Sequence, residues 1–130
     1  MATIFSKIVN GEIPCYKVAE DEFYLAFLDV NPIAKGHTLV IPKKEVDYIF
    51  DLENQDLSNL ILFSKRVANA LKSVIDCKKI GVSVIGLEVP HAHIHLVPIN
   101  AVHDMTFGKS ISIPSKELSD LAGEISSKFI

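Results

Sequence analysis

Apolar and polar positions recur along the chain with the two periods that distinguish helices from strands. Near the start, Ile4, Phe5 and Ile8 share one face of a short helical turn, which Asn10 and Gly11 end. Later segments are rich in β-branched and apolar residues and are bounded by proline, glycine or acidic turn residues, as strands are. We therefore expect strands at residues 16–19, 23–30, 37–41, 80–85 and 92–99.

Two other segments have helical periodicity. Between residues 54 and 75, one stripe of apolar side chains recurs every three or four positions: Leu57, Leu60, Ile61, Val67, Ala68, Leu71, Val74 and Ile75. A shorter repeat predicts a terminal helix over 115–129, with apolar Leu118, Leu121, Ala122 and Ile125. Because the strands follow one another in hairpins, we expect an α+β fold. An antiparallel sheet of about five strands would carry a long helix and a C-terminal helix.

Length and composition set the scale of this fold. The 130 residues suffice for a single domain, residues 1–130, with a core over about 3–100 and a C-terminal extension over 101–130. Hydrophobic residues make up 48% of the chain and charged residues 22%, which is a globular composition. The net charge of −3 argues against a broad surface for a nucleic-acid polymer, but it leaves room for a local nucleotide pocket.

Features of secreted and membrane proteins are not found in the sequence. No basic segment followed by an apolar run opens it, and the apolar run at 60–63 is far shorter than the ~20 residues that cross a bilayer. Cys15 and Cys77 lie too far apart in sequence to form a close-spaced zinc or redox motif. We therefore expect a cytoplasmic protein with no membrane partner.

The segment from His91 to Pro98 is the most informative part of the sequence. Side chains alternate faces along a strand, so His91, His93 and His95 are expected on one face. The residues between them are apolar and are expected to pack against the long helix: Ala92, Ile94 and Leu96. The strand thus predicts a row of imidazole rings opposite an apolar face.

Three interpretations of this row are open from the residues alone. The rings could form a solvated sheet face. They could bind zinc, although His91 and His95 lie roughly 13 Å apart along a strand, too far for both to reach one ion. A zinc site would therefore use two neighbouring rings and a third ligand, as in His37, His91 and His93. Finally, the rings could act in nucleophilic and acid–base catalysis, because the pKa of histidine lies near neutrality.

The motif His91-Ala-His93-Ile-His95-Leu-Val resembles the one that defines the histidine-triad (HIT) superfamily. Three further segments are similar to its Hint-like branch and occur in the family's order: residues 4–8 with 12–14, then 27–32 and 36–43. The resemblance implies a HIT-like α+β fold and a homodimer. It also implies an enzyme that transfers or hydrolyses a purine nucleoside monophosphate unit through a nucleotidyl-histidine intermediate, with no metal or cofactor required.

Roles for individual residues follow from the same resemblance. His93 would be the nucleophile, and the backbone carbonyl of His91 would hold the proton on its other ring nitrogen. His95 and His37 would donate hydrogen bonds to phosphate oxygens. Asp29 would bind the ribose hydroxyls, although it could instead only cap the turn at Asn31. The nucleotide pocket would be completed by Ile4, Phe5, Ile8, Phe27, Leu28, Val30, Glu88 and Val89.

The loop before the triad departs from the family pattern. Residues 82–87 form a shorter loop without the usual Asn, and Leu87 stands where Gln is usual. Glu88 stands where some members have a serine that serves the phosphate or the leaving group. We expect a nucleoside phosphoramidate as substrate. The alternatives are hydrolysis of dinucleoside polyphosphates and a nucleotide-binding regulatory module with negligible turnover.

Overall fold

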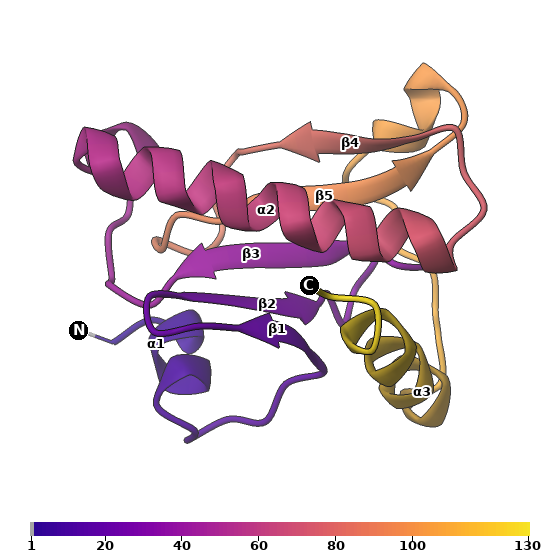
Figure 1. Cartoon of the computed structure of the whole chain (residues 1–130), viewed down its shortest axis with the longest axis horizontal. Helices are drawn as coiled ribbons and strands as arrows, with labels where there is room; N and C mark the ends of the chain where they lie inside the picture. The colour runs from indigo at the N-terminus through magenta and orange to yellow at the C-terminus, as the bar shows by residue number, and fades with distance from the viewer. Residues whose placement is uncertain (1) are drawn as a thin grey trace.

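The computed structural model describes residues 2–130. In this range it contains three α-helices: α1 (Ile4–Val9), α2 (Asn54–Val74) and α3 (Ser115–Ser126) (Figure 1). The strands are β1 (Lys17–Glu20), β2 (Tyr24–Leu28), β3 (Thr38–Pro42), β4 (Lys79–Ser83) and β5 (Ile94–Ile99). Short 3-10 helices span Ile49–Asp51 and Val102–Met105.

The strands form one sheet in the order β1-β2-β3-β5-β4, and every neighbouring pair is antiparallel. The expected α+β class with a five-stranded antiparallel sheet is therefore confirmed. The order places β5 between β3 and β4, away from the sheet edges. Because Leu39 on β3 is the register partner of His95 on β5, residues at the start of β3 lie beside the histidine strand.

Helix α2 lies across one face of the sheet (Figure 1) and forms the larger core with it. Leu60, Phe63, Val67 and Leu71 of α2 are buried there, and each contributes roughly 1.5–3 kcal/mol through loss of apolar surface to water. The expected apolar face of the histidine strand joins this core through Ala92, Ile94 and Leu96. Helix α3 packs on α2 and β1.

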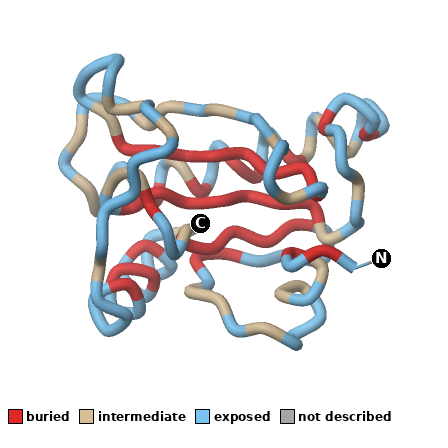
Figure 2. Tube along the Cα trace, turned by 180° about the vertical axis from the view of Figure 1, so that it is seen from behind, coloured by how far each residue is buried: buried red, intermediate tan, exposed pale blue. Residues whose placement is uncertain are grey.

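The opposite face of the sheet carries a smaller core under α1. Phe5 packs there with alternate residues of the neighbouring strands: Leu25, Phe27, Leu39 and Ile41. Seen from this side, β2, β3 and β5 are buried along nearly their whole length, whereas the edge strand β4 is not (Figure 2). Both faces of the sheet are thus covered near α1, and the histidine rings lie on the α1 side, since the Phe5 ring contacts those of His91 and His93.

Several expected elements differ in detail from the structure: the strands expected at 23–30 and 80–85 end at Leu28 and Ser83, and the helix expected at 115–129 ends at Ser126. Ile61 was expected in the buried stripe of α2 but is 49% exposed, whereas Phe63, which was not expected there, is buried. The buried face of α2 follows the spacing of Leu60, Ser64, Val67 and Leu71, and Ile61 lies outside it. Strand β5 begins at Ile94 rather than at residue 92, because the amide of Ala92 donates instead to the carbonyl of Val46. In the described part of the chain, no helix is long and apolar enough to cross a membrane.

Candidate active site

One ring nitrogen of His93 is hydrogen-bonded to the backbone, and the other is free and accessible. Its Nδ1 lies 2.7 Å from the carbonyl oxygen of His91. Because a carbonyl oxygen only accepts, Nδ1 carries the proton and donates it, which leaves a lone pair on Nε2 of the neutral ring. Within residues 2–130, every buried side-chain nitrogen or oxygen has a hydrogen-bond partner. Nε2 of His93 has no such partner, so this atom must be accessible to solvent.

The ring of His91 is fully buried and lines neither of the two cavities beside His93 that are described below. Its Nε2 donates to the carbonyl oxygen of Pro42 at 2.8 Å, and its Nδ1 lies 3.1 Å from the hydroxyl oxygen of Thr3. His91 therefore contributes its backbone carbonyl to the site, whereas its ring anchors the segment before β5. Burial lowers the pKa of His91, so the ring is neutral near pH 7.

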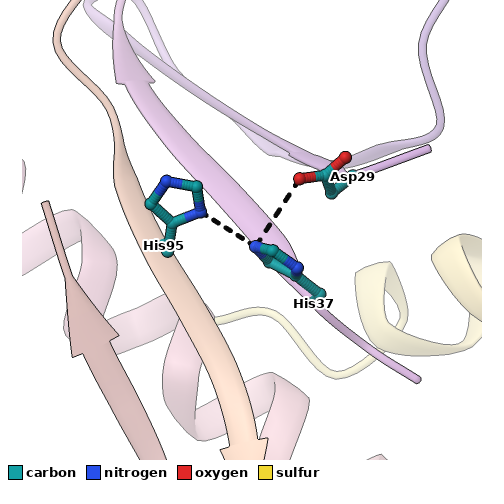
Figure 3. A group of neighbouring side chains, drawn as sticks. All are labelled: Asp29, His37 and His95. Carbon is teal, nitrogen blue, oxygen red and sulfur yellow. Dashed lines mark hydrogen bonds and ion pairs between the residues drawn. The ribbon is translucent and has the colours of Figure 1, made fainter. Parts of the chain in front are cut away.

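His37 and His95 form a second hydrogen-bonded pair (Figure 3). The amide of Ile33 donates to Nδ1 of His37 at 3.1 Å, so the ring proton of neutral His37 must be on Nε2. That atom lies 2.9 Å from Nδ1 of His95 and 3.6 Å from Oδ2 of Asp29. The shorter contact makes His95 the acceptor, so the ring proton of His95 must lie on Nε2.

This pairing changes the expected division of roles. Because the N–H of His37 is engaged by His95, the ring N–H of this pair that remains available belongs to His95. His37 is expected from the sequence to donate to phosphate as well, and in this structure its Nε2–H donates to Nδ1 of His95 and sets the proton position on that ring. Burial, followed by the nearby His93 and His37, lowers the pKa of His95 to about 4. Burial likewise lowers the pKa of His37.

Asp29 combines the two alternatives that the sequence left open. Its Oδ1 accepts the amide N–H of Asn31 at 2.8 Å, which caps the turn. Its Oδ2 faces His37, and the residue lines both cavities of the site (Figure 3). One carboxylate oxygen thus stabilises the loop while the other remains at the cavity.

A cavity of about 240 Å³ opens in front of His93 and His95. It brings together all nine residues expected in the nucleotide pocket: Ile4, Phe5, Ile8, Phe27, Leu28, Asp29, Val30, Glu88 and Val89. Pro14, Cys15, Asn31 and Leu39 also line it. The Phe5 ring stands edge-on to His93 at 5.0 Å between centroids, so the apolar end of the cavity leads directly to the open nitrogen.

A second cavity, of about 290 Å³, adjoins the first at the same histidines. His37, His93, His95, Asp29 and Glu88 line it together with the loop residues Ile85, Gly86 and Leu87. Phe107 and Gly108, from the C-terminal extension, complete it. The Phe107 ring contacts His95 edge-on, with centroids 4.8 Å apart. His93 and His95 therefore stand between two cavities, as groups acting on a central phosphate would.

Three residues around the histidines were not singled out from the sequence: Thr3, Glu45 and Phe107. Thr3 precedes α1 and has a detectable signal as its N-cap, since its hydroxyl accepts the amide of Ser6. Phe107 lies between β5 and α3, where no periodicity marks it. Glu45 is an exposed carboxylate after β3, and nothing local distinguishes it from a solvated surface residue.

The ligand set expected for zinc is not brought together. Both ring nitrogens of His91 are engaged by Pro42 and Thr3, so this ring is not free to join His37 and His93. Among residues 2–130, the group that could hold a metal ion is Asp29, His37 and His95. In this group, Nε2 of His37 carries the ring proton as long as the amide of Ile33 donates to Nδ1. The proton on Nε2 opposes metal binding at Nε2.

The fold and these cavities define an α+β protein with a histidine-lined site between an apolar pocket and a loop. Residues 10–102, more than half of the chain, match the family model of the HIT domain. The chain therefore belongs to the histidine-triad family.

Relatives and solved structures agree with this assignment. Adenosine 5'-monophosphoramidase hnt1 of Schizosaccharomyces pombe is 36% identical, over 98% of both chains. Adenosine 5'-monophosphoramidase HNT1 of Saccharomyces cerevisiae is 34% identical, over 89% of this chain and 72% of its own length. The crystal structure of a Hit-like protein involved in cell-cycle regulation from Bartonella henselae superposes with a TM-score of 0.84 at 31% identity. It covers 97% of this chain and 95% of its own.

Proposed function

We propose that the protein hydrolyses purine nucleoside phosphoramidates by nucleophilic attack of His93 on the α-phosphorus. The observation that carries the proposal is the state of the His93 ring. Its Nδ1 proton is held by a backbone carbonyl while its Nε2 lone pair opens to the cavity. A neutral imidazole in this tautomer is a competent nucleophile that needs no prior loss of a proton.

The reaction would proceed in two balanced displacements. In the first, Nε2 of His93 forms a bond to phosphorus as the phosphorus–nitrogen bond of the substrate breaks, and the amine leaves with a proton from water. In the second, water attacks phosphorus and the bond to Nε2 breaks. The nucleoside monophosphate is released, and the displaced proton goes to solvent. The Nε2–H of His95 would stabilise the negative oxygens in both displacements.

The cavities support a nucleotide placed across the two histidines. The apolar cavity beside Phe5 and Phe27 suits a purine base. Asp29 lines that cavity, and its Oδ2 could accept hydrogen bonds from the ribose hydroxyls. This arrangement would place the α-phosphate at His93 and direct the leaving group into the second cavity.

Glu88 favours an amine over a polyphosphate as the leaving group. Glu88 is exposed and lines both cavities together with His93 and His95. A carboxylate at this position would repel the additional charges of a dinucleoside polyphosphate, whereas it would not oppose a neutral or cationic amine. The names of the two yeast relatives, both adenosine 5'-monophosphoramidases, agree with this preference.

Release of AMP from adenosine 5'-phosphoramidate tests the proposal. The wild-type protein should release AMP, and His93→Ala should reduce the rate by at least ~10³-fold because it removes the nucleophile. His103→Ala, at an exposed histidine outside both cavities, is the matched control and should keep the wild-type rate. Equal rates for wild type and His93→Ala would contradict the proposal, as would faster cleavage of diadenosine tetraphosphate.

We further propose that the protein is a homodimer paired through α2 and the adjacent sheet edge. Ile61 and Leu62 of α2 are 49% and 58% exposed, and Val82 on the edge strand β4 is 61% exposed. Apolar side chains gathered at an unpaired edge strand favour burial against a second copy. A negative charge in such an interface would be costly to bury.

Leu62→Glu should therefore convert the dimer to a monomer in sedimentation-equilibrium or light-scattering measurements. Ser119→Glu introduces the same charge at an exposed position of α3, away from the proposed interface, and should leave the dimer intact. A wild-type protein that sediments as a monomer, or a Leu62→Glu variant that remains dimeric, would exclude this interface.

A further inference from the structure

A cluster of polar side chains lies behind the nucleophile, outside both cavities. It consists of Thr3, Ser6, Glu45 and His91, and we call it the Thr3–Glu45 cluster. Thr3 donates its amide N–H to Oε1 of Glu45 at 3.0 Å, and the hydroxyl of Ser6 donates to the same oxygen. The hydroxyl oxygen of Thr3 lies 3.1 Å from Nδ1 of His91.

The protons of this cluster can be assigned from its acceptors. The carbonyl of Pro42 accepts from Nε2 of His91, so Nδ1 of the neutral ring has a lone pair. The hydroxyl of Thr3 must then donate to Nδ1, while its oxygen accepts the amide of Ser6 at 3.0 Å. Every strong donor in the cluster therefore has one acceptor, and the chain of bonds runs from Glu45 through Thr3 to His91.

These bonds join three segments that are distant in sequence. Thr3 is 42 residues from Glu45 and 88 residues from His91, so α1, the segment after β3 and the segment before β5 meet at one point. Helix α1 also carries Phe5, whose ring contacts those of His91 and His93. A displacement of Thr3 would therefore be felt at the nucleophile through both the hydrogen bonds and the aromatic contact.

The link to catalysis is the carbonyl of His91. This oxygen holds the Nδ1 proton of His93 at 2.7 Å, and thereby fixes the ring orientation and the tautomer that leave Nε2 open. The ring of His91 is fastened on both sides, by Pro42 and by Thr3, so its peptide group has little freedom to turn. Small misplacements of a reacting group can lower a rate by about 10²-fold.

We propose that Thr3, Ser6 and Glu45 are positioning residues for the nucleophile, acting through the side chain and carbonyl of His91. The inference rests on the proposed function, in which His93 attacks phosphorus. None of the three residues lines either cavity. The expected effect of replacing them therefore falls on kcat rather than on nucleotide affinity.

Two pairs of variants test the cluster. Thr3→Val keeps the shape of the side chain and removes the hydroxyl, whereas Thr3→Ser restores it. Glu45→Ala removes the shared acceptor at an exposed site, whereas Glu45→Gln keeps an oxygen that can accept both bonds. With adenosine 5'-phosphoramidate, Thr3→Val and Glu45→Ala should lose about tenfold in kcat with little change in KM. Thr3→Ser and Glu45→Gln should recover most of it, and Glu22→Ala, at an exposed turn, is the control.

A second measurement does not depend on turnover. In ¹⁵N-resolved spectra, the Nδ1–H of His93 should be visible in wild type and exchange faster with water in Glu45→Ala. Wild-type kcat in both Thr3→Val and Glu45→Ala would overturn the proposal, as would a loss confined to KM or an unchanged exchange rate. If Thr3→Val does not fold, the exposed Glu45 pair decides. If wild type releases no AMP, the proposed function fails, and the exchange measurement still decides the role of the cluster.

Discussion

Three of the four histidines of the site, His37, His91 and His93, have one ring nitrogen bonded to a backbone group that can act only as a donor or only as an acceptor. Carbonyl oxygens of Pro42 and His91 only accept, which places protons on Nε2 of His91 and on Nδ1 of His93. The amide of Ile33 only donates, which places the proton of His37 on Nε2 and, in turn, that of His95 on Nε2. Main-chain groups thus determine which ring atom can attack and which can donate.

This relay predicts the effect of replacing His37. In His37→Ala, Nδ1 of His95 loses the donor that holds the proton on Nε2, so both tautomers of His95 become populated and kcat should fall by about tenfold. His37→Gln should recover part of the loss, since its amide can donate to the same atom. The measurement is kcat for adenosine 5'-phosphoramidate, with ¹⁵N chemical shifts of His95 reporting its tautomer. Identical kcat values and shifts in wild type and His37→Ala would contradict the relay.

Sequence patterns could identify the reactive rings but not what holds them. Alternation along 91–95 indicates that the histidines belong together, and the residues that resemble the family point to His93. The partners of His91 are Thr3 and the carbonyl of Pro42, which come from segments 88 and 49 residues away. No local pattern contains such long-range hydrogen bonds, so the sequence did not show that the His91 ring is engaged, and His91 stayed in the ligand set of the alternative zinc interpretation.

At the scale of elements, the turn before β3 determines where His37 lies. Gly36 has φ +93°, a conformation that side chains disfavour, and a Cβ at this position would meet Leu71 of α2 at 3.0 Å and Pro98 of β5 at 3.2 Å. The backbone can therefore pass between α2 and β5 only because this residue has no side chain.

Gly36→Ala should destabilise the protein by about 2–4 kcal/mol, since backbone strain and overpacking add. Gly108→Ala is the matched control: φ there is +97°, but no atom lies within 4 Å of the position of a Cβ, so only the backbone strain of about 1–2 kcal/mol applies. Urea denaturation of both variants measures the difference. Equal losses of free energy of unfolding would show that the close approach at Gly36 costs nothing.

Elements with a strong local signal could be predicted closely. Helix α2 was expected over 54–75 and spans Asn54–Val74, because twenty-odd residues of regular apolar spacing leave little choice of period. The start of β5 was misplaced by two residues, because the amide of Ala92 is claimed by Val46 from another part of the fold. Phe107 was missed for a similar reason, because a long-range contact places it. The C-terminal extension folds back on the site, where the amide of Ile111 donates to the carbonyl of Pro32, and this brings the Phe107 ring against His95.

For the whole molecule, burial of three uncharged histidines ties stability to the requirements of the site. His37, His91 and His95 are 2%, 0% and 8% exposed, and burial lowers the pKa of each ring below the ordinary value of 6.5. The neutral rings are what the hydrogen-bond network needs, since each uses a lone pair on one nitrogen as an acceptor. In the unfolded chain the same rings are in water and titrate near 6.5.

The sign of the pH dependence follows from this difference. Between pH 6.5 and about 4, the unfolded chain binds protons at His95 that the folded protein does not, so acid favours unfolding. The stabilising contribution is therefore complete above pH 6.5 and is lost as the pH falls through this window, with a slope of up to about 1.4 kcal/mol per pH unit for one histidine. His37 and His91 act in the same direction.

Urea denaturation at fixed protein concentration between pH 7 and 5 measures this slope. His95→Gln should flatten it, because the variant has one fewer group whose protonation differs between the two states. His103→Gln should leave it unchanged, because the His103 side chain is 85% exposed and is already in water in the folded protein. A free energy of unfolding that stays constant from pH 7 to 5 would mean that the rings accept protons in place. Since Nδ1 of both His91 and His95 would then have lost its lone pair, the hydrogen bonds from Thr3 and His37 could not exist as assigned.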